Sequence, residues 1–116
     1  MITNEFEIKK SRFITYLYNI DDESKVEEIV NNIRSEHKKA RHVVYVYKIG
    51  SNGKINDDGE PKGTAGMPIF NVLEKNNLNN ILIVVVRYFG GIKLGAGGLF
   101  RAYSKSASEI IKKLDN

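Results

Sequence analysis

The first twenty residues alternate between apolar and polar side chains, which is the period of a half-buried β-strand. Phe6 and Ile8 alternate with charged neighbours and predict a first strand. The polar residues 10–12 would turn the chain into a second strand over residues 13–20. We therefore expect a β-hairpin at the N-terminus.

The next segment changes to a helical period. Asp21 and Asp22 offer an N-cap, and acidic residues follow in the first turn, as a helix N-terminus favours. The apolar positions recur at i, i+3, i+4 and i+7 and are Val26, Ile29, Val30 and Ile33. This pattern predicts an amphipathic helix that ends near Lys39.

The middle of the chain returns to a strand pattern. Residues 43–49 alternate Val and Tyr, and Asn52-Gly53 is a strong hairpin signal. A short strand over residues 54–56 would complete this second hairpin.

The remaining elements are a loop, two helices and a strand. Residues 57–68 are rich in glycine and acids, and Pro68 suits the first turn of a helix over residues 69–75. The unbroken apolar run 81–86 is rich in β-branched residues and predicts a strand that is buried on both faces. A last helix is expected over residues 97–114.

The predicted order is β-β-α-β-β-α-β-α within one domain spanning residues 1–116. Two hairpins favour an antiparallel or mixed sheet over a doubly wound one. We expect a two-layer α+β sandwich with the helices on one face of the sheet.

Composition adds limits rather than a function. The 116 residues carry a net charge of +4, and no cysteine is present, which removes disulfides and thiolate metal sites. The longest apolar run has six residues, far short of a membrane span. We expect a cytoplasmic protein without a membrane partner.

A glycine-rich segment follows the buried strand and opens the last helix. Five of the ten glycines lie there, among cations and without an acid. A strand, glycine loop and helix start present free backbone N–H groups to an anion, so phosphate is the expected ligand. The alternative is purely architectural, with glycine required only for space. The candidate phosphate-binding residues are Arg87, Tyr88, Gly90, Gly91, Lys93, Gly95, Gly97, Gly98 and Arg101.

Three acids, Asp57, Asp58 and Glu60, form the densest carboxylate cluster. Two carboxylates can hold Mg²⁺ or transfer protons, but in a loop they more often form turns or ion pairs. One hypothesis pairs this acidic loop with Arg87 or Arg101 and so fixes the basic loop in place. We predict no metal site, no cofactor and no catalytic residue.

His42 lies at a strand start and lacks an obvious nucleophile. We interpret it as a half-buried histidine bonded to a loop carbonyl or carboxylate. Tyr88 and Phe89 end the buried strand and more often belong to a core, although such rings also stack on bases.

Two long motifs read DDGEPxGTAGxP over residues 57–68 and VRYFGGxKLGxGGLxRAY over residues 86–103. Shorter motifs are KSRF at 10–13 and ARH at 40–42. Together they resemble the IMPACT family, whose bacterial members include YigZ-like proteins. The signature residues outside the glycine segment are Lys10, Ser11, Arg12, His42, Asp57, Asp58, Glu60 and Thr64.

The resemblance implies a fold like the second domain of ribosomal protein S-five and a non-enzymatic role in the regulation of translation. It also implies a second, ferredoxin-like domain in bacterial members, which we expect to be absent from residues 1–116. The starvation-kinase role of eukaryotic members is not transferred, because it involves an N-terminal domain ahead of the motif.

Three functional hypotheses remain. The first is a module that binds structured RNA or the ribosome through the basic glycine segment. The second is a nucleotide-binding enzyme with phosphate on Gly95–Gly98 and Mg²⁺ on Asp57 or Asp58. The third is a protein–protein adaptor that uses exposed Tyr16 and Tyr18.

Overall fold

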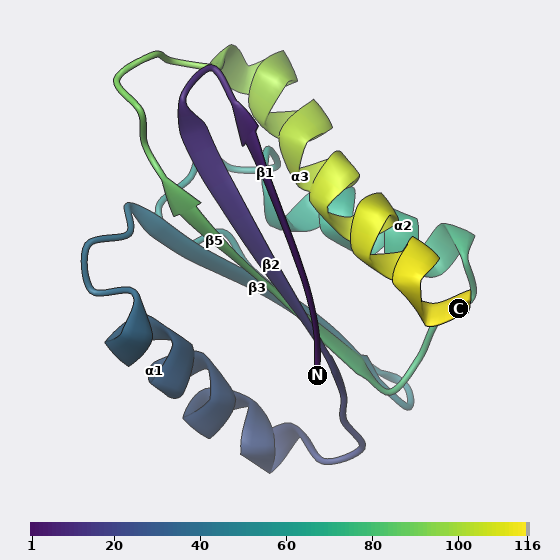
Figure 1. The fold of residues 1–116 in the computed structure, drawn as a ribbon. Coiled ribbons are helices and arrows are strands. Elements are labelled where there is room, and N and C mark those ends of the chain that lie inside the picture. Colours follow the sequence, from purple (N-terminus) through teal and green to yellow (C-terminus); the bar gives the residue numbers. More distant parts are fainter. Residues whose placement is uncertain (116) are drawn as a thin grey trace.

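The computed structural model describes residues 1–115 and contains a five-stranded sheet with helices on both faces (Figure 1). The strands are β1 (Ile2–Ile8), β2 (Ser11–Asn19), β3 (His42–Ile49), β4 (Asn52–Asn56) and β5 (Ile81–Tyr88). Their order across the sheet is β1-β2-β5-β3-β4, and every neighbouring pair is antiparallel. The expected α+β class, element order and antiparallel sheet are confirmed. The predicted turn at Asn52-Gly53 is wrong, because Ile49 pairs with Asn52; the second hairpin turns at Gly50 and Ser51, and Asn52 and Gly53 lie in β4.

Three helices flank the sheet. They are α1 (Val26–Glu36), α2 (Gly66–Lys75) and α3 (Gly95–Lys112), with short 3₁₀ turns η1 (Glu23–Lys25) before α1 and η2 (Lys113–Asp115) after α3. Both α2 and α3 begin earlier than the sequence suggested, and Pro68 lies within the first turn of α2. No helix among residues 1–115 has the length and apolar character needed to cross a membrane.

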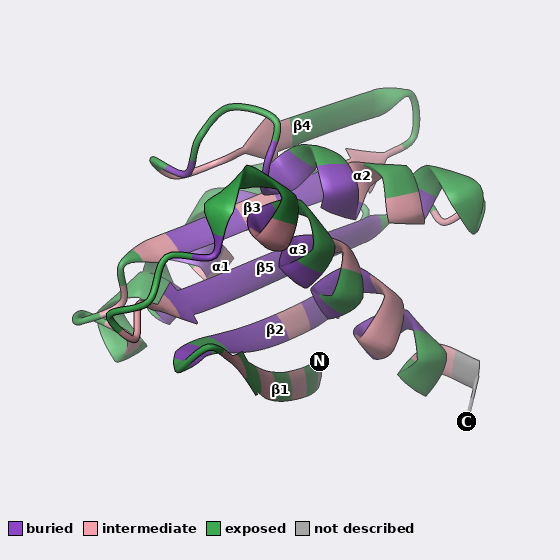
Figure 2. Cartoon of the chain, turned by 90° about the horizontal axis from the view of Figure 1, so that it is seen from above, coloured by how far each residue is buried: buried purple, intermediate pink, exposed green. Residues whose placement is uncertain are grey.

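Strand β5 lies at the centre of the sheet, and Figure 2 shows it buried along most of its length. Alternate residues such as Ile83 and Val85 pack towards α2 and α3, whereas Leu82 and Val84 pack towards α1. The prediction of a strand buried on both faces is therefore confirmed.

The placement of the helices differs from the expected two-layer arrangement. Helix α1 covers one face of the sheet through Val26, Val30 and Ile33, and α2 and α3 cover the other. The expectation that all helices share one face is wrong. The reason is β5 itself, because a strand with apolar side chains on both faces needs cover on both.

The first hairpin turns at Lys9 and Lys10, one residue earlier than predicted, since β2 already begins at Ser11. Both lysines have positive φ, 47° and 66°. A two-residue turn with two positive φ angles is type I′, the form that matches the twist of paired strands.

Candidate phosphate-binding cleft

The antiparallel order gathers the motifs at one end of the sheet. Strands β2 and β3 begin at this end, and β1, β4 and β5 finish there, so Arg12 lies opposite Tyr88 and His42 opposite Arg87. The turn at 9–10, the loop 57–65 and the glycine segment thus become neighbours although they lie far apart in the sequence.

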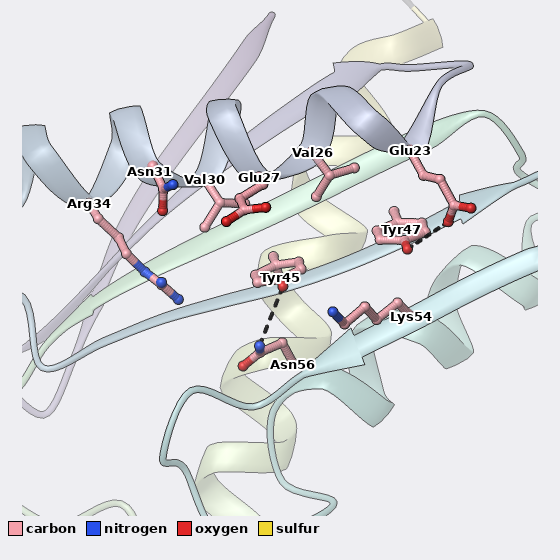
Figure 3. A pocket seen from close by; sticks show the side chains of 10 residues that line it. All are labelled: Glu23, Val26, Glu27, Val30, Asn31, Arg34, Tyr45, Tyr47, Lys54 and Asn56. Atoms are coloured by element: carbon pink, nitrogen blue, oxygen red, sulfur yellow. Dashed lines mark hydrogen bonds between the residues drawn. The ribbon is translucent and has the colours of Figure 1, made fainter.

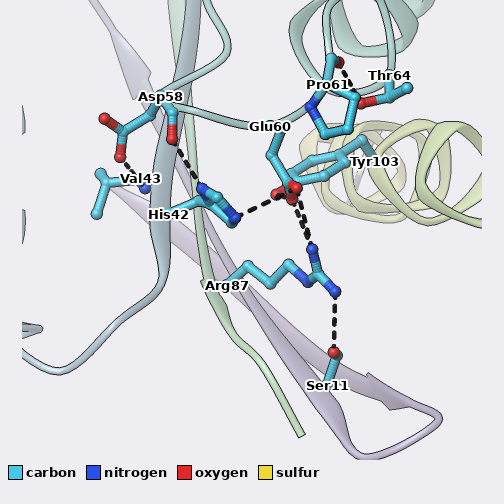
Figure 4. Close-up of polar contacts among 9 residues, drawn as sticks. All are labelled: Ser11, His42, Val43, Asp58, Glu60, Pro61, Thr64, Arg87 and Tyr103. Atoms are coloured by element: carbon cyan, nitrogen blue, oxygen red, sulfur yellow. Dashed lines mark hydrogen bonds and ion pairs between the residues drawn. The ribbon is translucent and has the colours of Figure 1, made fainter. Parts of the chain in front are cut away.

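The carboxylate of Glu60 is the centre of a buried polar network at this end (Figure 4). Arg87 Nη1 donates to both carboxylate oxygens, at 3.0 and 2.9 Å. The Tyr103 hydroxyl donates to Glu60 Oε2 at 2.5 Å, and His42 Nε2 lies 3.3 Å from Oε1. The side chains of Glu60 and Arg87 are only 2% and 6% exposed, so each charge depends on the other for compensation.

Two further details fix the network. Arg87 Nη2 donates to Ser11 Oγ at 3.4 Å, which links β5 to the start of β2. Burial, followed by the negative charge of Glu60, raises the pKa of Tyr103 far above its ordinary value of 10.0. Tyr103 therefore stays protonated as a donor to the carboxylate.

The other two acids of the loop accept hydrogen bonds from backbone amides. Asp57 Oδ1 accepts from the Gly66 amide at 2.7 Å, and Asp58 Oδ2 accepts from the Val43 amide at 2.6 Å. Thr64 anchors the same loop by donating to the Pro61 carbonyl. The hypothesis that this acidic loop pairs with Arg87 is confirmed for Glu60.

His42 is half-buried and bridges the loop and the network. Its Nδ1 lies 2.7 Å from the backbone oxygen of Asp58, an atom that only accepts, so Nδ1 is the donor. The interpretation of His42 as a half-buried histidine bonded to a loop carbonyl or a carboxylate is confirmed for the carbonyl. Within residues 1–115, no group of three or more His, Asp or Glu side chains is arranged to hold a metal ion.

A cleft of about 430 Å³ opens beside this network. It lies between residues 59–61, the start of β3, the end of β5 and the start of α3. Two exposed cations, Arg41 and Lys93, line it together with the buried pair Glu60 and Arg87. The ring of Phe89 also lines it, and the Arg41 guanidinium lies 4.8 Å from the ring centroid. Since Arg87 balances Glu60, the two rim cations give the cleft a positive charge.

The N-terminus of α3 forms one wall of the cleft through Leu94, Gly95 and Ala96. Among residues 1–115, no side chain caps the first turn of α3, and that turn contains no acid. The backbone N–H groups there remain available to a ligand, and the helix dipole adds a partial positive charge.

The glycines of this segment divide into two kinds. A Cβ on Gly90 would overlap the backbone carbonyl of Lys10, so Gly90 is needed for close packing against the first hairpin. Gly91 and Gly95 have φ of 91° and 74° and border open space, a backbone shape that glycine adopts without strain. Architecture explains Gly90, whereas Gly95 also lies in the cleft wall.

The structure does not bring every candidate to the cleft. The Tyr88 hydroxyl instead forms a hydrogen bond with His37 Nδ1 at 2.5 Å. The Arg12 guanidinium lies 5.2 Å from the centroid of the Tyr88 ring. Arg101 is exposed on α3, with its guanidinium beside Gly97. Gly98 packs against Leu94 within the first turn.

Two cleft residues, Arg41 and Phe89, lie outside the predicted phosphate-binding set, although Phe89 was considered as a ring that could stack on bases. Arg41 directly precedes the strand that starts at His42, and its amide donates to the Arg87 carbonyl at 2.9 Å. The signal that could have found Arg41 is its place in the ARH motif, since the adjacent His42 was already singled out.

A second groove, of about 340 Å³, lies on the other face of the sheet between α1 and the β3–β4 hairpin (Figure 3). Its lining carries both signs of charge, since Glu23 and Glu27 are acidic and Arg34 and Lys54 are basic. This mixed lining favours no single ionic ligand. Tyr16 and Tyr18, expected to be exposed, are half-buried, and the Tyr16 hydroxyl lies 2.7 Å from His37 Nε2.

The family model described as the Impact N-terminal domain matches residues 9–111, and the chain belongs to the IMPACT family. It is 51% identical over 109 residues to the IMPACT family member YvyE of Bacillus subtilis, covering 91% of this chain and 50% of that protein. It is 42% identical over 113 residues to the IMPACT family member YigZ of Escherichia coli, covering 93% and 55%. The chain thus spans about half the length of these relatives.

Two solved structures share the fold. A crystal structure of a hypothetical protein aligns with a TM-score of 0.93 at 39% identity, covering 97% of this chain and 57% of that one. The two-domain translational regulator Yih1 aligns with a TM-score of 0.51 at 21% identity, covering 97% and 44%. The second likeness concerns the fold alone.

Proposed function

We propose that this domain is a non-enzymatic, phosphate-recognising module that binds structured RNA and acts in the regulation of translation. The observation that carries the proposal is the cleft, where Arg41, Lys93 and the uncapped N-terminus of α3 meet. Three sources of positive charge with free donors suit a phosphate group better than any neutral ligand.

The neighbouring acids strengthen this reading because their charges are already engaged. Glu60 is bonded to Arg87 and Tyr103, and Asp57 accepts from a backbone amide. By contrast, the ion pairs identified among residues 1–115 do not include Arg41 or Lys93. The exposed charge at this end of the sheet is therefore mainly positive.

RNA is favoured over an isolated phosphate because the cleft also offers an aromatic surface. Phe89 lines it with Arg41 stacked nearby, and planar groups of this kind support nucleotide bases in single-stranded segments. A loop or bulge in structured RNA would supply both a phosphate and an unpaired base.

A binding role is favoured over catalysis by the state of the carboxylates. Glu60 lines the cleft, where a general base would have to lie. Its carboxylate oxygens, however, already accept hydrogen bonds from Arg87 and Tyr103. The link to translation rests on the family and on the description of the fold neighbour Yih1 as a translational regulator.

The test is co-sedimentation with ribosomes over a salt series, with wild type beside Arg41→Ala/Lys93→Ala. Loss of two phosphate contacts should weaken binding and reduce the slope of log K against log[salt] by about 1.4–1.8. Lys25→Ala/Lys75→Ala is the matched control, because both lysines are exposed at the opposite end of the sheet. Equal binding by the cleft variant and the control would reject the site.

A further inference from the structure

The turn between β1 and β2 places lysine where backbone energetics favours other residues. Lys9 and Lys10 both adopt left-handed conformations, with φ of 47° and 66°. A type I′ turn prefers Asn-Gly, because glycine has no Cβ and asparagine tolerates this region through local hydrogen bonds. Lysine offers neither advantage, so the turn is less stable than the same backbone could be.

The lysine side chains contribute little to the packing of the domain beyond the Cβ of Lys10, which lies close to Gly90. Both are exposed, and neither takes part in the ion pairs identified among residues 1–115. Backbone strain of this kind clusters at functional sites, which makes the turn a candidate for a binding role.

The turn is held beside the glycine segment. The carbonyl of Lys10 packs so closely on Gly90 that a Cβ at position 90 would overlap it. Figure 1 shows the β1–β2 hairpin next to the loop that leads into α3. Lys9 and Lys10 are thus presented on a fixed support at the same end of the sheet as Arg41 and Lys93.

We infer that the Lys9–Lys10 turn is a second phosphate-contacting element, which binds the backbone of the RNA whose phosphate occupies the cleft. This inference rests on the proposed function. The turn supplies two positive charges and, at its tip, no aromatic side chain to stack on a base. It therefore contributes affinity and orientation rather than base recognition.

Two variants separate charge from backbone strain. Lys9→Gln/Lys10→Gln removes the charges and keeps two residues with a Cβ in left-handed conformations. Lys9→Asn/Lys10→Gly removes the charges and installs the preferred turn, while the carbonyl of residue 10 that meets Gly90 is kept. Lys25→Gln/Lys75→Gln is the control for an equal loss of charge elsewhere.

Binding is measured by fluorescence anisotropy with a labelled RNA stem-loop over a KCl series, and Tm is measured by circular dichroism. Both turn variants should bind more weakly than the control, with the salt slope reduced by about 1.4–1.8. Only the Asn-Gly variant should also show a raised Tm. Weaker binding by a more stable protein cannot be attributed to unfolding.

The outcomes distinguish this inference from the proposed function. If Arg41→Ala/Lys93→Ala loses affinity and both turn variants bind as the control does, the turn inference is overturned and the cleft stands. If the turn variants lose affinity and the cleft variant does not, the turn is supported and the cleft assignment fails. If the wild type does not bind the stem-loop at low salt, both are overturned. Unchanged affinity together with aggregation of the Asn-Gly variant would assign the lysines to solubility and reject the inference.

Discussion

Replacing Glu60 with alanine should destabilise the domain by about 3–5 kcal/mol, because Arg87 would keep a buried charge without its partner. Arg87 is only 5% exposed, and its guanidinium makes two contacts with the Glu60 carboxylate at 3.0 and 2.9 Å. The Tyr103 hydroxyl would lose its acceptor at the same time.

The expected loss is large compared with the stability of a small domain, which is typically about 5–15 kcal/mol. Glu60→Gln also removes the charge that compensates Arg87, but it keeps an acceptor oxygen for Tyr103. Its cost should therefore be smaller than that of Glu60→Ala. The double change Glu60→Leu/Arg87→Leu should recover part of the loss, since it leaves no unpaired charge.

Urea denaturation followed by far-UV circular dichroism gives these free energies. The matched control is Glu74→Ala, because Glu74 pairs with Lys48 at 3.0 Å but its side chain is 52% exposed. An exposed ion pair contributes less than about 1 kcal/mol. If Glu60→Ala costs no more than Glu74→Ala, the assignment of Glu60–Arg87 as the support of this end of the sheet is refuted.

Two further predictions follow from the same network and its neighbours. Because its pKa is raised, the Tyr103 hydroxyl stays protonated in the folded protein, whereas in the unfolded chain it ionises near pH 10.0. The free energy of unfolding should therefore fall as pH rises above 10.0, by up to about 1.4 kcal/mol per pH unit. Urea midpoints from pH 9 to 11 should fall less steeply for Tyr103→Phe, and equal slopes would contradict the assignment. Gly90→Ala should destabilise by about 1–3 kcal/mol because its Cβ meets the Lys10 carbonyl, whereas Gly97→Ala, near only the flexible Arg101 side chain, should be neutral or stabilising in thermal melts.

The local patterns predicted the elements well because each is visible within a single segment. The apolar run 81–86 identified the central strand, and the i, i+3, i+4 and i+7 spacing identified α1. The placement of α1 on the opposite face was missed, although the same apolar run already required cover on both faces of the sheet.

The site was predicted only in part. The pairing of the acidic loop with Arg87 was foreseen from opposite charges at neighbouring element ends, but the role of Tyr103 as donor to Glu60 was not. That contact joins residues 43 positions apart through the packing of α3 on the sheet. Arg41 and Phe89 enter the cleft through strand register, which brings the start of β3 beside the end of β5.

The most direct test of the central claim is a titration of the ¹⁵N-labelled protein with an RNA stem-loop, followed by amide chemical shifts. Recognition of phosphate at the cleft predicts the largest changes at Arg41, Lys93 and the first turn of α3, where the uncapped amides lie. High salt should abolish these changes. The account is contradicted if the shifts fall instead on the groove between α1 and the β3–β4 hairpin, or if they persist unchanged in Arg41→Ala/Lys93→Ala.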